Sequence, residues 1–445
     1  KGTYFGPIDP VTGRATTGTL QYGEVKGPWM VGGDYRYTAS NYLGTMSLVP
    51  AEERTGLFSR VSAEITPDIE VYGQFSYNRS ETLNIYIQTP NNVVTIQKDN
   101  AYLPTSITDE MTRLGLSSLS IGTTNAGIPP GGGNVTRNVF RYVAGAKGNM
   151  DLFGKGWTWD LYYQKGVAKA HELTVGVWNN ARVAAATDAV VAPAGNAAGI
   201  AAGTIVCRST LTSPANGCVP INRIGIGGVT EAALNYIFTD QQPYRDQKIT
   251  QDVAALTFSG ELFDLPAGPV AVALGGEWRK EQVTGFVKPE YNSGWLYGNY
   301  LVNRGQYTVK ETFLEVAAPI FSGFEINAAG RYTDYSTSGS VQTWKLGATY
   351  SPIPDIRFRG TLSHDIRAPN LDELFAAGTA RSNTVNLHGV SSPFVANISG
   401  NPNLKPEVAK AWSVGTVLSP GFIPGLNISF DYYDISIKDA IGTLG

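Results

Sequence analysis

Few residues of the 445-residue chain are arranged in a pattern that could do chemistry. The three histidines, His171, His364 and His388, are far apart in the sequence, so they indicate neither a zinc site nor a catalytic triad. Residues 148–155 have the wrong spacing for a phosphate-binding loop and lack the Ser or Thr that would follow its lysine. There is no Gly-x-Ser-x-Gly elbow, and adjacent carboxylates such as Asp372 and Glu373 are typical of solvated loops. We therefore predict no enzymatic activity, no metal site and no cofactor.

The two cysteines are the next candidates for chemistry. Cys207 and Cys218 are close in sequence, flanked by Ser, Pro, Asn and Gly, and lie in a long stretch without strand periodicity. A bridge between them would close a short loop and contribute roughly 2 to 3 kcal/mol locally, which suits an oxidising compartment such as the periplasm or cell surface. Two unpaired thiols in a cytosolic protein are the alternative. A metal role is less favoured, because no histidine is near and one pair cannot complete a tetrahedral site.

The remaining charged residues follow strand periodicity. In residues 355–363, Ile356, Phe358 and Leu362 fall on one parity and the charged or hydroxyl residues on the other, a two-residue period that predicts a strand with two unlike faces. The strands at 343–350, 324–332 and 314–320 repeat this design. Full charges occur in mid-strand on the polar parity, among them Glu315, Arg331, Lys345, Arg357 and Arg359.

The apolar parity distinguishes two classes of β-protein. A soluble antiparallel sheet would bury its apolar face in a core. Here Trp, Tyr and Phe gather near the strand ends with small and aliphatic residues between them, which is typical of a lipid-facing band flanked by aromatic girdles around a water-filled lumen. We favour a transmembrane β-barrel, with a large soluble β-protein as the alternative.

Composition agrees with a barrel. Only 16% of residues are charged, against about 25% in a typical soluble domain, and an outer belt in lipid cannot hold charge. The net charge of −3 indicates no nucleic-acid partner. No run of 18 apolar residues predicts a transmembrane helix, and the start, Lys1-Gly-Thr-Tyr, is not a signal segment.

The pattern predicts about twelve strands of roughly 9 to 11 residues, in six hairpins. Residues 1–50 read as an irregular hairpin or loop and residues 51–445 as the barrel. One connection of each pair is short and rich in Pro or Gly, and long extracellular loops are expected at about 80–136, 166–248, 280–307 and 366–409. Outer-membrane barrels sort their loops in this way. Within the second loop, Thr230–Phe238 predicts a short helix that Thr230 caps and whose apolar residues pack the loop.

Three motifs carry a resemblance to a known family. They are RAPNLDELF (367–375), GNPNLKPE (400–407) and GLNISFDYYDISIKDAI (425–441). In this order they resemble the C-terminal half of the barrel of TonB-dependent outer-membrane receptors, and residues 207–236 are similar to a disulfide-closed extracellular loop of a subgroup of that family. The family-motif residues are Arg367, Pro369, Asn370, Asn401, Pro402, Asn403, Pro406 and Glu407.

The resemblance implies an all-β, antiparallel barrel of about 22 strands, closed by an N-terminal plug whose short segment (the TonB box) engages the TonB complex. We expect about 12–14 of these strands here. No plug precedes Lys1, and two bare sheet edges would be costly in lipid, so we expect these residues to be part of a longer protein.

The candidate ligand-binding residues are those on the polar parity that would face the lumen, namely Arg331, Arg357, Arg359, Asp431 and Tyr433. Cross-strand pairing and contact with the plug are the competing roles for these side chains, and we favour them. The long loops are better candidates for substrate capture, because specificity in such scaffolds lies in loops.

The resemblance implies an outer-membrane receptor, held in outer-membrane lipid, for TonB-energised uptake of a scarce small-molecule nutrient such as an iron chelate or oligosaccharide. A passive porin or another channel or assembly barrel is the alternative. A surface-exposed carbohydrate-binding β-protein without transport is a third class.

Overall fold

The computed structural model describes residues 3–8, 15–19, 24–26, 29–31, 46–86, 89, 91–103, 105–123, 125, 127–223, 229–387 and 390–442. His388 lies outside the described residues, as do residues 224–228 of the loop that carries the cysteines.

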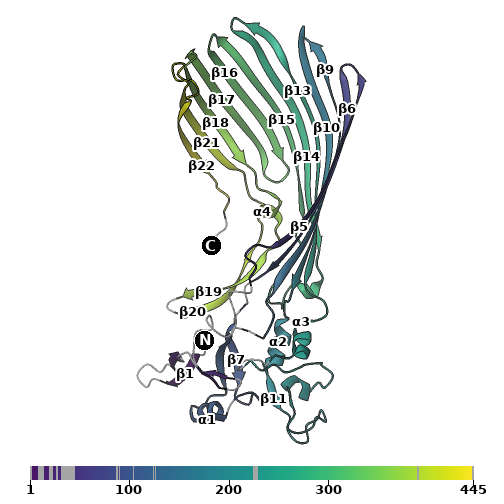
Figure 1. Ribbon diagram of the computed structural model, residues 1–445, viewed down its shortest axis with the longest axis vertical. Coiled ribbons are helices and arrows are strands. Elements are labelled where there is room, and N and C mark those ends of the chain that lie inside the picture. The colour runs from purple at the N-terminus through teal and green to yellow at the C-terminus, as the bar shows by residue number, and fades with distance from the viewer. Residues whose placement is uncertain are drawn as a thin grey trace.

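One curved, twelve-stranded sheet dominates the structure (Figure 1). Its order is β22-β21-β18-β17-β16-β15-β14-β13-β10-β9-β6-β5, and every neighbouring pair is antiparallel. The strands are β5 (Ala51–Thr66), β6 (Ile69–Ile85), β9 (Gly132–Leu152), β10 (Lys155–Val175), β13 (Tyr244–Leu265), β14 (Gly268–Phe286), β15 (Gly305–Phe321), β16 (Phe324–Tyr335), β17 (Gly339–Ile353), β18 (Ile356–Arg367), β21 (Glu407–Leu418) and β22 (Ile428–Lys438). The predicted all-β antiparallel architecture and its dozen strands are confirmed.

The described strands do not close into a ring. β5 and β22 form the two edges of the sheet, and within the described part of the chain they are not paired with each other. Both strands are exposed along their whole length. The sheet is therefore an open, barrel-like wall (Figure 1).

Several strands are longer than the sequence analysis predicted. β9 and β10 have 21 residues each and β13 has 22, about twice the expected length. The prediction followed the apolar alternation, but backbone pairing continues where the apolar parity itself has come to carry lysine, as between Lys169 and Lys248. As a result the connections are shorter than the predicted loops and comprise residues 86–131, 176–243, 287–304 and 368–406.

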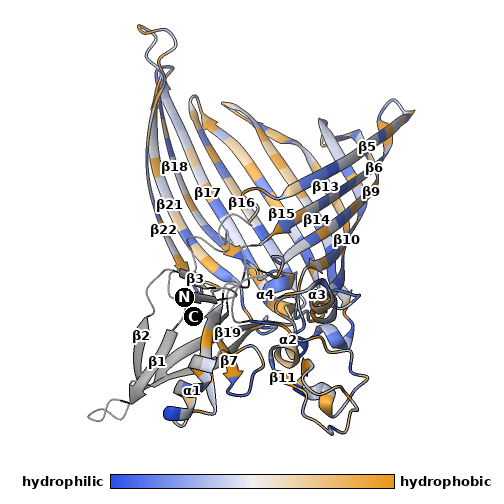
Figure 2. Cartoon of the chain, turned by 60° about the horizontal axis from the view of Figure 1, so that its bottom comes forward, coloured by the Kyte–Doolittle hydropathy of each residue, from blue (hydrophilic) through white to orange (hydrophobic). Residues whose placement is uncertain are grey.

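The two faces of the sheet differ as the periodicity predicts. Large apolar side chains remain exposed on one face, with Leu314 at 51% and Leu346 at 49%. We call this the outer face, and Figure 2 shows apolar and polar residues alternating along the strands. On the opposite face, side chains two strands apart meet: the Tyr72 hydroxyl donates to Asp160 across β9 at 3.1 Å. Side chains two strands apart converge most readily on the concave side of a curved sheet, and we therefore take the polar face as the inner one.

Glycines make such contacts across a strand possible. Gly145 of β9 lies beneath Tyr72, and a Cβ at this position would be 2.5 Å from the phenol ring. Gly415 of β21 plays the same part beneath Asp431. These two glycines are required by the close approach of a neighbouring side chain, not by a turn.

The long connections gather at one end of the sheet, at the bottom of Figure 1, and hold all the described helices. The helices are α1 (Thr105–Arg113), α2 (Asn180–Thr187), η1 (Arg208–Leu211), α3 (Glu231–Phe238), η2 (Pro289–Tyr291) and α4 (Leu371–Phe375), and the additional strands are β7 (Asn91–Gln97), β8 (Ser118–Thr123), β11 (Ala189–Val191), β12 (Ile205–Cys207), β19 (Thr379–Leu387) and β20 (Val390–Ile398). None of the helices in the described ranges is long and apolar enough to cross a bilayer.

The N-terminal region contributes two small hairpins. They are β1 (Thr3–Ile8) with β2 (Ala15–Thr19), and β3 (Glu24–Lys26) with β4 (Trp29–Val31). The predicted irregular hairpin or loop over residues 1–50 falls largely on residues outside the described ranges.

The predicted helix in the second long connection is confirmed. α3 begins after Thr230, whose side chain accepts a hydrogen bond from the Ala233 amide, and the apolar residues Ala233 and Ile237 are fully buried. They pack with Ile128, Trp178, Ala186 and Ile221 in a small core. This core joins the connections 86–131 and 176–243. We call these two connections together the cap.

Candidate functional site

The structure places the five predicted ligand-binding residues on the inner face but does not gather them into one site. Arg331 lies 2.9 Å from Glu311 and over the ring of Phe313. Arg357 donates a 3.3 Å hydrogen bond to Ser351. These two arginines are thus occupied by pairing along the wall, the role that the sequence analysis favoured.

Arg359 and Asp431 are the one pair among the five that the structure brings together. The Arg359 Nε donates to Asp431 at 2.8 Å, and another guanidinium nitrogen donates to Ser429 at 2.9 Å. The pair crosses β21 over Gly415. Tyr433, on the same strand as Asp431, is 68% exposed.

A hydrogen-bonded belt on the inner face was not anticipated from the sequence. Arg141 of β9 donates to Gln74 of β6 and to Gln164 of β10 at 3.2 and 2.6 Å. Gln164 donates to Gln251 of β13, which donates to Glu281 of β14, each at 3.0 Å. The Tyr307 hydroxyl of β15 completes the belt with a 2.6 Å bond to Glu281. The belt spans six neighbouring strands and presents amide and charged groups to the lumen.

Aromatic residues and one ion pair lie where the inner face meets the cap. Arg245 pairs with Glu172 at 2.6 Å and lies over the ring of Tyr300. Burial raises the pKa of the Tyr300 phenol to about 12, and the Glu172 carboxylate acts in the same direction. The phenol therefore stays protonated at neutral pH. Tyr86 of the connection 86–131 and Tyr297 of the connection 287–304 pack edge to face with each other. We call this end of the inner face the mouth, and it offers phenol rings and a guanidinium to a ligand.

The cap is held together by polar contacts as well as by its core. The predicted disulfide between Cys207 and Cys218 is present. The adjacent Arg208 donates to Asp99 at 2.6 Å and to Asp188 at 2.9 Å, so it joins the two connections. The hydrogen bonds from Arg208 lower the pKa of the Asp99 carboxyl. Arg223, which is 6% exposed, donates to Asn125 across the same junction at 2.7 Å.

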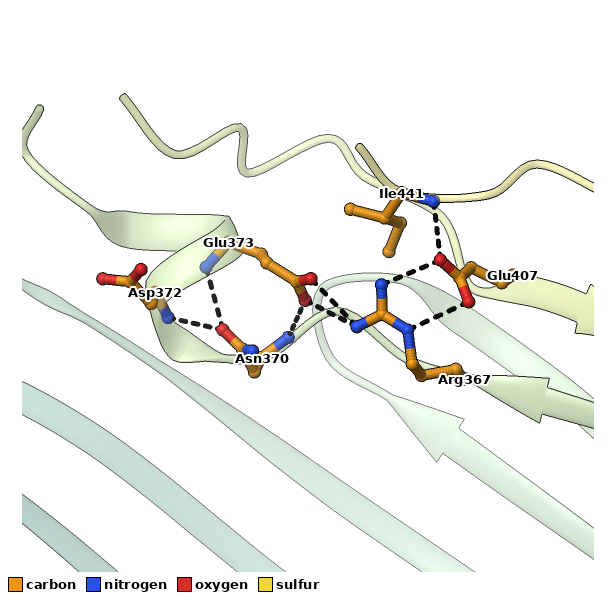
Figure 3. A network of polar contacts seen from close by, with 6 residues as sticks. All are labelled: Arg367, Asn370, Asp372, Glu373, Glu407 and Ile441. Carbon is orange, nitrogen blue, oxygen red and sulfur yellow. Dashed lines mark hydrogen bonds and ion pairs between the residues drawn. The ribbon is translucent and has the colours of Figure 1, made fainter. Parts of the chain in front are cut away.

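Family-motif residues form a network of ion pairs and hydrogen bonds at the end of β18 (Figure 3). We call the network of Arg367, Asn370, Glu373 and Glu407 the fastener. Arg367 pairs with Glu407 at the start of β21 at 2.8 Å and with Glu373 of α4 at 2.9 Å. Asn370 caps α4, since its side chain accepts from the Asp372 and Glu373 amides at 2.9 Å. In return, the Glu373 carboxylate accepts from the Asn370 amide at 2.8 Å, which completes a capping box.

The second motif closes the other side of this fastener. The Asn401 amide donates to the Glu373 carbonyl at 2.8 Å, and the Asn401 side chain accepts from the Asn403 amide at 2.9 Å. Pro369 and Pro406 are buried, whereas Pro402 is exposed. The motif thus builds a scaffold, and its residues are bound to one another.

The fastener holds α4 against the inner face. Leu374 is 1% exposed and packs with Tyr307 and Val309 of β15. Phe375 covers Gly305, where a Cβ would be 2.1 Å from the ring. The Ala377 amide donates to Asn303 at 2.9 Å. α4 therefore reaches from β18 to β15, at the end of the sheet where the long connections begin.

A curved antiparallel sheet with an exposed apolar outer face, a polar inner face and long connections gathered at one end defines the class of transmembrane β-barrel proteins. A family model described as TonB dependent receptor-like, beta-barrel matches residues 98–445. The chain belongs to this family, whose members are outer-membrane receptors.

Solved structures of this family share the fold. The chain is similar to the ferric enterobactin receptor PfeA of Pseudomonas aeruginosa, as the R480A/Q482A mutant, with 15% identity and a TM-score of 0.50 over 91% of this chain and 46% of that one. A complex of PfeA with BCV-L6 gives 15% identity and a TM-score of 0.51, over 92% and 47%. The siderophore receptor PirA of Acinetobacter baumannii gives 14% and 0.49, over 87% and 43%. The chain thus spans less than half the length of the receptors it matches, and no curated protein sequence matches it.

Proposed function

We propose that the chain is the greater part of the wall of an outer-membrane receptor that imports a scarce nutrient, such as an iron chelate or oligosaccharide, with energy supplied through TonB. The observation that carries the proposal is the division of the sheet into an exposed apolar face and a polar inner face, in a chain that belongs to this family. On this proposal the outer face contacts lipid and the cap lies outside the cell.

The inner mouth is the proposed entry for substrate. Arg245, Tyr300 and the belt residues supply guanidinium, phenol and amide groups, which suit a polar or anionic small molecule. The fastener holds α4 against the wall beside this entry. The remaining predicted residues, Arg331, Arg357, Arg359, Asp431 and Tyr433, we propose to be lumen-facing groups that a passing ligand meets after the mouth.

Uptake by a deletion strain tests the proposal. Strains that carry the intact gene should accumulate a labelled nutrient only when TonB is functional, and the deletion strain should lose that uptake. Growth on single candidate iron chelates and oligosaccharides then identifies the nutrient. A passive porin predicts uptake that is independent of TonB, and a surface carbohydrate-binding protein without transport predicts that the protein leaves the cell surface without detergent.

A further inference from the structure

Two arginines on the inner face of β9 have no carboxylate partner among the residues that the structure describes. Arg137 is exposed and makes neither an ion pair nor a side-chain hydrogen bond within these residues. Arg141 donates to the side-chain oxygens of Gln74 and Gln164 and makes no ion pair there. The ladders of β9 with β6 and β10 run without a bulge, so both arginines point to the lumen. We call Arg137 and Arg141 the arginine pair.

The wall around the arginine pair carries no negative charge. From the belt to the mouth, the other inner-face positions of β6, β9, β10 and β13 hold Ser, Thr, Asn, Gln, Gly, Ala, Val or Ile, at every second residue of 74–82, 135–141, 164–170 and 247–251. The next carboxylate toward the mouth is Glu172, which Arg245 neutralises at 2.6 Å. Elsewhere on the inner face arginines are paired, as Arg331 is with Glu311. The arginine pair is therefore a local excess of positive charge.

Small side chains flank both arginines. Each has a serine beside it on β6 and Gly or Ala beside it on β10, the register partners being Ser80 and Ala170 for Arg137, and Ser76 and Gly166 for Arg141. These side chains are too short to cover a guanidinium group. Both cations are thus open to a ligand in the lumen.

An apolar step separates the two cations. Val139 lies between them on the same face and is 39% exposed. It is in register with Ala168, which is in register with Ile249 of β13, and Ile249 is 44% exposed. Exposed aliphatic side chains on a polar wall suit the C–H surface of a sugar ring, while the neighbouring Ser, Asn and Gln side chains suit its hydroxyl groups.

The spacing of the arginine pair selects an extended anion. Four residues along a strand span roughly 13 Å. Gln74 and Gln164 are both register partners of Val143. Val143 lies beyond Arg141 as seen from Arg137, so the two hydrogen bonds hold the Arg141 guanidinium away from Arg137. The two positive charges are too far apart to share one carboxylate, whereas two carboxylates on one extended chain fit them.

The arginine pair also lies on a line that leads inward from the mouth. Glu172, which binds Arg245 at the mouth, is the register partner of Val135. Arg137 is the next inner-face residue of β9, and Arg141 belongs to the belt. A chain that enters past the phenol rings of the mouth therefore meets the two cations in succession.

We propose that the arginine pair binds two carboxylates of an acidic oligosaccharide, a chain of sugars that carries uronic acid groups. The inference rests on the proposed function and names the substrate class of that lumen. Guanidinium groups bind carboxylates through two parallel hydrogen bonds, so each arginine supplies a separate subsite.

Binding of defined oligosaccharides to the full-length receptor, purified in detergent, tests the proposal. The probes are the tetramers of galacturonate, glucuronate, mannuronate and guluronate, each beside its neutral methyl ester. The variants are Arg137→Gln, Arg141→Gln and the two together. Calorimetry should show that at least one acidic tetramer binds the wild type, about tenfold more weakly each single variant and about 100-fold more weakly the double variant. The methyl ester should bind wild type and variants alike.

The matched control is Arg79→Gln with Lys345→Gln, which removes the same charge. Arg79 has the outer parity of β6, and Lys345 has the inner parity of β17, several strands away from β9. The control should bind each tetramer as the wild type does. Equal affinity of the double variant and the control would overturn the proposal.

Other probes decide the chemistry of the ligand. Absence of binding by all four acidic tetramers, or equal weakening of a tetramer and its methyl ester, would overturn the proposal. Tighter binding of tetraglutamate than of every tetramer would assign the pair to acidic peptides instead. A ferric tris-catecholate whose binding is abolished by either single substitution would assign it to a compact chelate, and each of these two results overturns the oligosaccharide assignment.

Folding and transport are measured separately. Heat-modifiable migration in gels checks folding, and Arg137→Gln, which removes no contact within the described residues, should fold even if Arg141→Gln loosens the belt. A lower thermal midpoint of Arg137→Gln with unchanged tetramer affinity would assign that arginine to a structural contact and overturn the proposal. TonB-dependent uptake of a neutral nutrient by all variants would overturn the substrate class and leave the transport proposal standing. Uptake without TonB would instead remove the transport proposal while binding of the tetramer persists.

Discussion

Leu374 is the side chain on which the position of α4 depends, and Leu374→Ala isolates that role. It is 1% exposed and packs on Tyr307 and Val309. Removing a buried leucine side chain costs about 2 to 5 kcal/mol, and about 3 kcal/mol is expected here because the β15 wall cannot collapse into the space. This loss of stability falls on α4 and not on the sheet. The equilibrium constant for local unfolding of α4 should therefore rise by about 100-fold.

Hydrogen exchange of the purified protein in detergent measures this opening. The amides of Leu374 and Ala376, which donate to Asn370 and Asp372, should lose about 100-fold of protection, together with those of residues 400–401. The matched control is Leu362→Ala, since Leu362 is 47% exposed on the outer face and should leave α4 unchanged. A change below about fivefold at α4, or an equal loss in the α3 amides, would refute the packing argument.

Three more predictions follow from single contacts. In Gly415→Ala, the new Cβ would be 2.0 Å from Asp431 and should expel that carboxylate from Arg359. Asp431→Asn should lower the thermal midpoint of the wild type but not that of Gly415→Ala, whereas in Gly360→Ala, where the nearest neighbour of the new Cβ is 3.7 Å away, it should still lower the midpoint. Arg208 lowers the pKa of Asp99, so the contact stabilises the cap above the ordinary carboxyl value of 3.8 and is lost as pH falls through the lower folded value; exchange protection of β7 should fall in acid, and an identical acid loss in Asp99→Asn would contradict this. Cys207→Ser with Cys218→Ser should cost the cap roughly 2 to 3 kcal/mol and expose residues 208–217 to protease, with no change in heat-modifiable migration; unchanged cleavage would show that the bridge does not hold this loop.

The sequence predicted what depends on local periodicity. The alternation around Ile356 and Phe358 predicted strands and their faces, because side chains of a strand alternate regardless of the partner. Thr230 predicted the start of α3, because capping is a contact within one turn. The proximity of Cys207 and Cys218 was enough for the disulfide.

The features that it missed depend on distant partners. Gln164 and Gln251 carry no charge and are 87 residues apart, so nothing local marks them as members of a belt. Strand ends were misplaced because polar strands continue to pair. α4 could have been found, since Asn370 followed three residues later by Glu373 has the spacing of a capping box. Its packing on β15 could not, because that contact joins elements separated by two strands in the sheet.

β10, β13 and β14 continue beyond the exposed aromatic side chains Tyr163 and Trp278. The part of these strands that would contact lipid is therefore separate from the part that carries the connections. On the proposed placement in the membrane, the residues up to Tyr163 and Trp278 contact lipid, while the connection 176–243 begins only after Val175, at the end of a paired ladder that extends beyond these aromatic side chains. Replacement of residues 176–243 by another folded insert should therefore leave assembly of the wall intact. On the proposed function, such an exchange would change which ligand is recognised and leave the sheet unchanged.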